Sequence, residues 1–240
     1  MAGTPTRIAL AAALAAGVLL GSGADAPAAQ AGPLPERMAR TGGGSQLITA
    51  EAPSTASTHG TVTWWQRRNG RWVKAGSSPA RFGAGGLTEG RGRRQGTSTT
   101  PTGLYGLPYA FGTAAAPAGT SVAYRRVTAR SWWCQDNGSA SYNRWVAPLP
   151  RDCSARDAER LSAYPTQYAR ALVIGYNYAR PVRGRGAGIF LHVNGRGATA
   201  GCVSVPAAAM ARILAWVAPS ARPHIAIGTA DRGPTAITRY

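Results

Sequence analysis

The sequence predicts a mostly β domain with two or three short helices. Short segments rich in Val, Thr and aromatic residues recur along the chain, turn residues separate them, and only residues 206–217 carry apolar side chains at clear helical spacing. The 240 residues, of which 44% are apolar, are enough for one ordinary domain with its own core. A second domain would be cramped.

Residues 1–31 are expected to form a secretory signal peptide. Arg7 supplies positive charge, residues 8–20 are an apolar run, and Ala29-Gln30-Ala31 offers a cleavage site between small residues. The run is short for a bilayer span, so we expect cleavage and no stable membrane span afterwards, with an uncleaved anchor as the alternative. The mature protein is therefore expected to be secreted or to stay in the cell envelope.

The segment that follows has a different composition. Residues 32–57 are rich in Gly, Pro, Ser, Thr and Ala and contain few apolar residues, which is typical of a flexible linker. We therefore expect the folded domain to occupy residues 58–230 and residues 231–240 to form a C-terminal tail.

The clearest strand signal is a hairpin. Residues 61–66 and 71–75 favour strands, and Asn69-Gly70 between them is a strong turn signal. Residues 82–96 are a glycine-rich loop. The further strand candidates are residues 100–105, 122–127, 171–178, 188–193 and 224–228.

Two segments predict helices. Ser154 suits the N-cap of a short helix over residues 154–163, and acidic residues lie in its first turns. Pro206 suits the first position of a helix over residues 206–217, and Pro219 ends that helix.

The cysteine count is odd for an exported protein, which normally pairs its thiols. Cys134 and Cys153 flank a polar, turn-rich stretch. We expect these two to form a disulfide, which leaves Cys202 as a free thiol.

Cys202 lies close in sequence to one of only three histidines. An apolar strand ends at His192, a glycine-rich loop follows, and Cys202 comes just ahead of the helix that begins at Pro206. A nearby imidazolium and a helix N-terminus would both favour the reactive thiolate. The backbone N–H groups of Gly201 and Cys202 are candidates for stabilising an oxyanion. The pattern indicates a nucleophile with its base, although a buried, inert cysteine is the alternative.

These residues resemble the signature of the L,D-transpeptidase (YkuD-type) catalytic domain family. The signature has a strand-end histidine, here His192, followed by a sequence that corresponds to Thr199-Ala200-Gly201-Cys202, with a polar residue, Ser204, two positions after the cysteine. The upstream Thr100-Pro101-Thr102-Gly103-Leu104-Tyr105 is similar to the family's Thr-Pro-x-Gly-x-Tyr segment. The resemblance covers roughly residues 61–228 and indicates a divergent, actinobacterial-type branch. It implies a β-sandwich or barrel fold.

The resemblance also implies an activity. Cys202 would take an acyl group from a peptidoglycan stem peptide and release terminal D-alanine, and the amine of a second stem would then attack the thioester. His192 would be the base, Thr199 would orient the imidazole, and Ser204 and Tyr105 would contact the substrate. No metal or cofactor takes part in the family's reaction.

Two positions depart from the family pattern. The family usually has histidine where this chain has Ala200, and arginine or asparagine where it has Ser204. Both departures concern how a stem peptide is held.

The formal net charge of +18 favours anionic partners, and because the chain is predicted to be exported, we expect the anionic cell wall and no nucleic acid. Two alternatives stay open: a thiol hydrolase resembling an L,D-carboxypeptidase, and a non-catalytic wall-binding module that uses aromatic residues around Trp132 and Trp145. A metallopeptidase is disfavoured because no histidine pair has ligand spacing, and a serine hydrolase because no Gly-x-Ser-x-Gly sequence occurs.

Overall fold

The computed structural model describes residues 1–3 and 32–240. The folded domain comprises Gly32–Tyr240. The predicted signal peptide lies almost entirely outside the described residues. None of the helices within the described ranges is long and apolar enough to cross a membrane.

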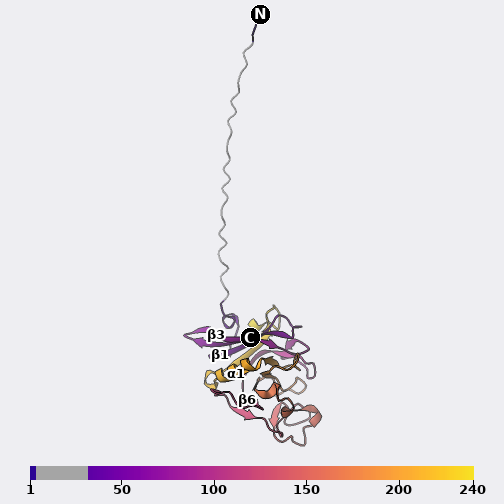
Figure 1. Cartoon of the computed structure of the whole chain (residues 1–240). Helices are drawn as coiled ribbons and strands as arrows, with labels where there is room; N and C mark the ends of the chain where they lie inside the picture. The colour runs from indigo at the N-terminus through magenta and orange to yellow at the C-terminus, as the bar shows by residue number, and fades with distance from the viewer. Residues whose placement is uncertain (4–31) are drawn as a thin grey trace. The chain divides into compact units, whose positions relative to one another are not determined.

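The domain is mostly β, as predicted, and centres on one large mixed sheet. Figure 1 labels β1, β3 and β6 of this sheet and the helix α1. A smaller sheet has the order β10-β8-β9. In spatial order, the large sheet contains β4 (Leu87–Glu89), β5 (Thr100–Gly106), β14 (His224–Thr229), β1 (Gln46–Ala52), β2 (His59–Arg68), β3 (Arg71–Arg81), β13 (Val203–Val205), β12 (Phe190–Val193), β11 (Ala171–Val173), β6 (Ala110–Gly112) and β7 (Tyr124–Arg126). The small sheet contains β8 (Trp132–Cys134), β9 (Arg144–Val146) and β10 (Ala158–Arg160).

The prediction of a flexible linker over residues 32–57 is wrong. This segment contains β1, which pairs in parallel with β14 and antiparallel with β2, and Ile48 has no exposed surface. Before β1, the 3-10 helix η1 (Leu34–Arg37) packs Leu34 into a small cluster with Leu47. The small and polar residues that flank β1 mask it in a composition average, although its own residues form a short apolar run. The folded domain therefore begins near residue 32.

The C-terminal residues also belong to the domain and are not a free tail. The 3-10 helix η6 (Ile237–Arg239) buries Ile237. The hydroxyl of Tyr240 lies 2.7 Å from that of Thr102 on β5. This end of the chain therefore covers one end of the large sheet.

The hairpin predicted at Asn69-Gly70 is confirmed and joins β2 to β3. Asn69 and Gly70 have φ values of 48° and 79°, in the left-handed region that a tight turn between twisted strands requires. Asparagine and glycine tolerate that conformation better than other residues.

The C-terminal helix is confirmed as α1 (Ala207–Trp216), the one α-helix in the described part of the chain, and Pro206 is its N-cap. The helix predicted over residues 154–163 is wrong. Ser154 does cap a turn, because its hydroxyl accepts a hydrogen bond from the N–H of Arg156, but the turn is a short 3-10 helix followed by β10. Pairing of β10 with β8 overrides the local preference for a helix. The remaining short 3-10 helices are η2 (Ala155–Asp157), η3 (Leu161–Ala163), η4 (Gln167–Ala169) and η5 (Pro219–Ala221).

The predicted disulfide is present between Cys134, at the end of β8, and Cys153, just before η2. Cys202 is free and buried. The disulfide therefore holds the small sheet to the segment that leads into β10.

The two faces of the large sheet bury different kinds of residue, because side chains alternate along each strand. On one face, Leu191 and Val203 belong to a cluster with Met210 and Leu214 of α1. On the other, Phe190 and Cys202 belong to an aromatic cluster whose other members include Phe111, Trp133, Tyr142 and Tyr168. The free cysteine therefore lies on the face away from the helix.

Candidate active site

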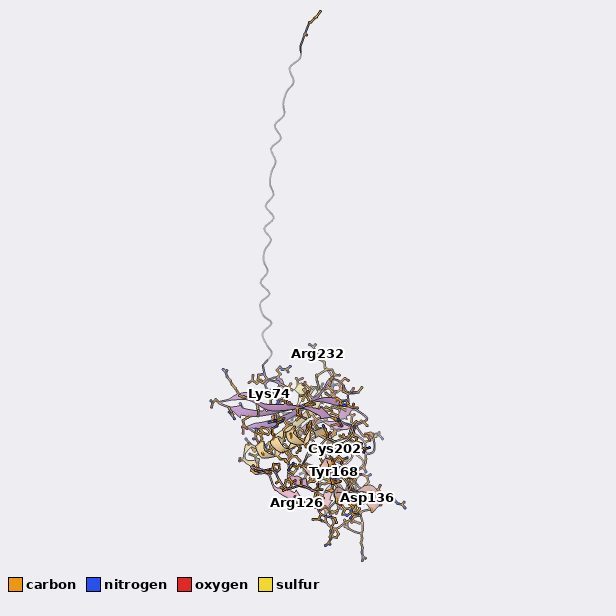
Figure 2. The ribbon with its side chains drawn as sticks, viewed as in Figure 1. Lys74, Arg126, Asp136, Tyr168, Cys202 and Arg232 are labelled. Atoms are coloured by element: carbon orange, nitrogen blue, oxygen red, sulfur yellow. A yellow bond between two sulfur atoms is a disulfide. The ribbon has the colours of Figure 1, made fainter. Side chains whose placement is uncertain are left out.

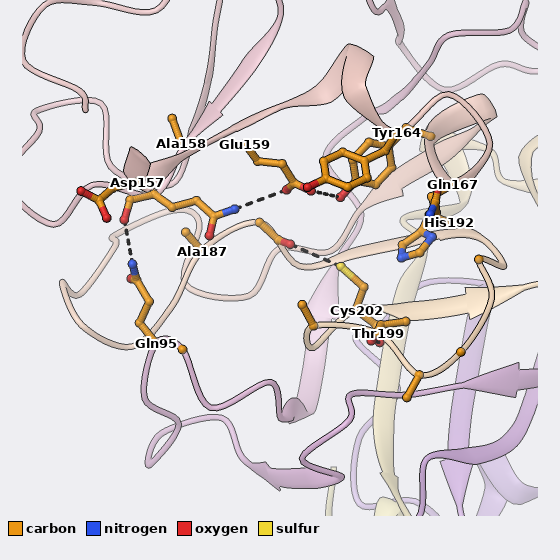
Figure 3. Close-up of a pocket in the computed structure, with 18 of the residues that line it drawn as sticks. Gln95, Asp157, Ala158, Glu159, Tyr164, Gln167, Ala187, His192, Thr199 and Cys202 are labelled. Atoms are coloured by element: carbon orange, nitrogen blue, oxygen red, sulfur yellow. Dashed lines mark hydrogen bonds between the residues drawn. The ribbon is translucent and has the colours of Figure 1, made fainter. Parts of the chain in front are cut away.

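A cavity of about 560 Å³ lies beside the aromatic cluster. Cys202 and Tyr168 lie together within the domain, whereas Lys74 and Arg232 lie at its outline (Figure 2). Figure 3 shows Cys202 and His192 on one wall of the cavity and Glu159 on another. The polar and charged residues that line it include Gln95, Gln135, Arg156, Asp157, Glu159, Gln167, Tyr168, His192, Arg196, Thr199 and Cys202.

Parallel pairing of β12 with β13 brings the histidine and the cysteine together. Leu191 is the register partner of Val203, and His192 that of Ser204, so Cys202 enters the sheet beside the strand that carries His192. Two sequence segments separated by a glycine-rich loop thus place both side chains at one cavity.

Backbone groups of the neighbouring segment hold the Cys202 thiol. Its Sγ donates a hydrogen bond to the carbonyl of Gly188 and accepts one from the N–H of Phe190, both at 3.4 Å. In the described part of the chain, no hydrogen bond joins the sulfur to the His192 ring.

Gly201 is required immediately before the cysteine for two reasons. Its φ of 128° lies in the region that favours glycine, and a Cβ there would come within 2.7 Å of Nη2 of Arg93. Arg93 is only 5% exposed and donates to the carbonyls of Thr99 and Arg185. A buried guanidinium therefore lies directly behind the loop that carries Cys202.

The His192 ring has a defined tautomer. Nδ1 lies 2.8 Å from the carbonyl oxygen of Val193, which can only accept, so Nδ1 carries the proton and Nε2 is left as an acceptor. The ring also packs edge-on against Tyr168, with centroids 5.5 Å apart. His192 is thus fixed with a lone pair available for a proton.

The predicted imidazolium–thiolate pair is wrong for this structure, because both groups are buried. Burial lowers the pKa of His192 to about 4, against the smaller opposing effect of its hydrogen bond to Val193. The pKa of Cys202 is raised to about 12, first by burial and then by the Glu159 carboxyl, against the lowering effects of the Phe190 N–H and the Arg93 guanidinium. The resting pair is a neutral thiol and a neutral imidazole.

The expected assistance from the helix N-terminus is also absent. Strand β13 separates Cys202 from α1, which begins at Ala207. The field of a helix terminus falls off within about one turn, so it does not favour a thiolate at this position.

The resemblance implied that Thr199 orients the imidazole, and this prediction is wrong. Its hydroxyl donates to the carbonyl of Cys202 at 2.7 Å and accepts from the N–H of Gly201 at 3.1 Å. The Val193 carbonyl orients His192 instead. The Gly201 N–H already donates to Thr199, so of the two predicted oxyanion donors only the Cys202 N–H remains available. Thr199 shapes the loop that carries Cys202.

The two residues predicted to contact substrate lie elsewhere. Ser204 is fully buried and donates to Oδ1 of Asn194 at 2.8 Å, and it does not line the cavity. Tyr105 lines a separate cavity of about 320 Å³ together with Tyr176 and Tyr240, and its hydroxyl donates to the carbonyl of Thr102 at 2.6 Å. Both predictions are therefore wrong.

Glu159 and Tyr168 were not predicted as site residues from the sequence. The Tyr168 hydroxyl donates to the Glu159 carboxyl at 2.7 Å, and both line the cavity. Burial raises the pKa of Glu159, and the Tyr168 hydrogen bond lowers it. The sequence held no signal for this pair, since Glu159 fell within the predicted helix over residues 154–163 and Tyr168 fell outside every predicted element.

The fold and this cavity define a mostly β domain that presents one free cysteine and one neutral histidine on a sheet face. The family model of the L,D-transpeptidase catalytic domain, YkuD, matches residues 55–225, and the chain belongs to this family. The matched residues include both His192 and Cys202.

Solved structures are among the proteins to which the chain is similar. The chain is similar to Bd1075 of Bdellovibrio bacteriovorus at 15% sequence identity with a TM-score of 0.38, over 78% of this chain and 48% of that one. The chain thus spans about half the length of that structure. No curated protein matches the chain.

Proposed function

We propose that this protein is an exported enzyme that transfers an acyl group between peptidoglycan stem peptides through a thioester on Cys202, with His192 as the base. One observation carries the proposal. The free thiol and an imidazole with an unprotonated Nε2 line the same 560 Å³ cavity in a domain of the L,D-transpeptidase family.

The neutral resting pair favours a concerted acylation. As Sγ attacks the carbonyl carbon of the donor peptide, the thiol proton passes to Nε2 of His192, and a C–S bond forms. The Cys202 N–H stabilises the oxyanion. The bond to the terminal D-alanine then breaks, and His192 returns the proton to its amine. A pre-formed thiolate is not needed.

Deacylation reverses the roles. The amine of a second stem attacks the thioester carbonyl, a C–N bond forms and the C–S bond breaks. His192 takes a proton from the attacking nitrogen and delivers it to the leaving sulfur. Water attacking in place of the amine gives the hydrolase, so the alternative differs only in the acceptor.

Basic residues on the cavity wall favour a substrate peptide that carries carboxylates. Arg156 and Arg196 line the cavity at exposed positions. We propose that they bind donor carboxylates, a role for which Ser204 is too buried. Ala200, also exposed on the wall, leaves room beside Cys202 for the peptide.

The disulfide supports export, because such bonds persist in oxidising compartments. The wall-binding alternative has less support. Trp132 and Trp145 are half-buried; Trp145 packs edge-on against Phe111, and the Arg160 guanidinium covers Trp132. Neither ring is a free platform for a glycan.

Two measurements test the proposal. Intact mass after incubation with a carbapenem is expected to show one covalent adduct on the wild type and none on Cys202→Ser. A stem tetrapeptide is expected to release D-alanine with the wild type and not with the variant. Failure of the folded wild type to acylate with either compound would overturn the proposal.

A further inference from the structure

Glu159 places a carboxyl group on the wall of the Cys202 cavity in a protein with few acidic residues. The chain has 27 basic and 9 acidic residues. Glu159 comes from β10 of the small sheet and reaches the cavity that Cys202 and His192 line from the large sheet (Figure 3).

Neutral donors hold this carboxyl group. One oxygen accepts from the Tyr168 hydroxyl at 2.7 Å, and the other lies 3.3 Å from the side-chain amide of Gln135. Both supports are anchored in turn. The Tyr168 ring packs on the Phe190 ring, with the ring centroids 5.7 Å apart. The backbone carbonyl of Gln135 accepts a hydrogen bond from the Gln95 side-chain amide at 2.8 Å. The position of the carboxyl group is therefore fixed before any ligand binds.

The carboxyl group has no cationic partner among the described residues. Burial and the Tyr168 hydrogen bond are the influences that shift its pKa, and no arginine is among them. The nearby Arg160 side chain donates to the carbonyl of Ala129 and covers Trp132 instead. A half-buried carboxyl group that lacks an internal cation is suited to a cation that arrives with a ligand.

The carboxyl group and the Cys202 thiol line the same cavity, and the carboxyl group accordingly raises the pKa of Cys202. A cation bound to it would therefore lie close to an acyl group on Sγ. Of the reacting groups in the proposed reaction, only the acceptor amine arrives with positive charge.

We propose that Glu159, supported by Tyr168 and Gln135, is the residue that binds the ammonium group of the acceptor stem peptide. The inference rests on the proposed function and deepens it, because it assigns the acceptor side of the cavity and favours a transferase over a hydrolase.

The role is consistent with the proton balance of aminolysis. The bound ammonium gives one proton to the carboxylate, which becomes a carboxylic acid, and the neutral amine attacks the thioester. The C–N bond forms, the C–S bond breaks, and a second proton passes from nitrogen through His192 to sulfur. The carboxylic acid then releases its proton to solvent.

The test is a partition experiment on the acyl-enzyme formed from a stem tetrapeptide. Nα-acetyl-lysine amide serves as a cationic acceptor and hydroxylamine as a neutral one at the same pH. For Glu159→Gln, the ratio of aminolysis to hydrolysis is expected to fall at least tenfold with the lysine probe and to stay within twofold with hydroxylamine. Glu89→Gln, which removes an exposed carboxylate outside this cavity, is expected to match the wild type.

The outcomes separate the two proposals. If the wild type forms no acyl-enzyme, the proposed function itself fails. If acyl-enzyme forms and Glu159→Gln partitions like the wild type with the lysine probe, the inference is overturned while the proposed function stands. If Glu159→Gln does not fold, the ratio of aminolysis to hydrolysis is compared between Glu159→Asp and the wild type. A wild-type rate of aminolysis that rises linearly with the concentration of the lysine probe, without saturating, would overturn the inference.

Discussion

The thiol of Cys202 donates its hydrogen bond to the backbone carbonyl of Gly188, 3.4 Å away, although the His192 ring lines the same cavity. A thiol that donates to a carbonyl is held in its protonated form. The N–H of Phe190, on the same sulfur, would favour a thiolate, but burial outweighs it. Cys202 therefore rests as a neutral thiol.

The first prediction concerns the reactivity of this thiol. Because burial raises its pKa to about 12, alkylation of Cys202 by iodoacetamide is expected to be slow at pH 8.5 and to keep rising above pH 10. Glu159→Gln removes a charge that raises this pKa, so its profile is expected to shift to lower pH. Arg93→Met removes a charge that lowers it, so its profile is expected to shift to higher pH.

The measurement is alkylation rate against pH, followed by intact mass under native conditions. A small-molecule thiol with an ordinary pKa is the control. A wild-type profile centred near pH 8.5 would contradict the neutral, buried thiol.

The second prediction is a loss of stability in acid caused by His192. Its pKa is about 4 in the folded domain and 6.5 in the unfolded chain, so its contribution is fully present above pH 6.5 and is lost as the pH falls towards 4. The free energy of unfolding is expected to fall by about 3 kcal/mol more in the wild type than in His192→Gln over this window. Urea denaturation at several pH values measures it, and equal slopes in both proteins would show that the histidine is not buried in its neutral form.

The third prediction concerns the disulfide. Replacing Cys134 and Cys153 together by serine is expected to lower the free energy of unfolding by about 3 kcal/mol, the chain-entropy cost for a loop of this length. Activity is expected to fall as well, because the bridged segment leads into β10 and Glu159. Denaturation of the double variant beside the wild type, both under non-reducing conditions, checks the stability. An unchanged midpoint would indicate that the small sheet is held by its packing alone.

The fourth prediction tests β1 as an integral strand. Ile48→Ala is expected to destabilise the domain by about 2–5 kcal/mol, because it leaves a cavity at a fully buried position. Deletion of residues 32–57 is expected to prevent folding, because β2 and β14 would lose the strand between them. Limited proteolysis followed by mass spectrometry complements both variants. Rapid cleavage within residues 46–52 of the native protein would restore the linker interpretation.

Local signals in the sequence predicted part of the fold. Asn69-Gly70 defined a hairpin because few residues accept the φ values of that turn, and the spacing of apolar residues after Pro206 defined α1. Strand β1 was missed because its flanks resemble a linker, and the helix over residues 154–163 was mispredicted because its backbone pairs with β8. In both cases a distant strand supplies hydrogen bonds that no local window contains.

The site divides in the same way. The sequence by itself determined the identity of the chemical groups: Cys202 as the unpaired cysteine, His192 at a strand end, Gly201 before Cys202, and the Cys134–Cys153 bridge. Only the tertiary structure decided their state and their neighbours. Burial leaves Cys202 and His192 neutral, the Val193 carbonyl orients the imidazole, and Tyr168 and Glu159 reach the cavity from segments whose local patterns mark neither residue. The physical reason is that residue type and spacing along the chain are local properties, whereas desolvation and charge proximity depend on which segments pack together in three dimensions.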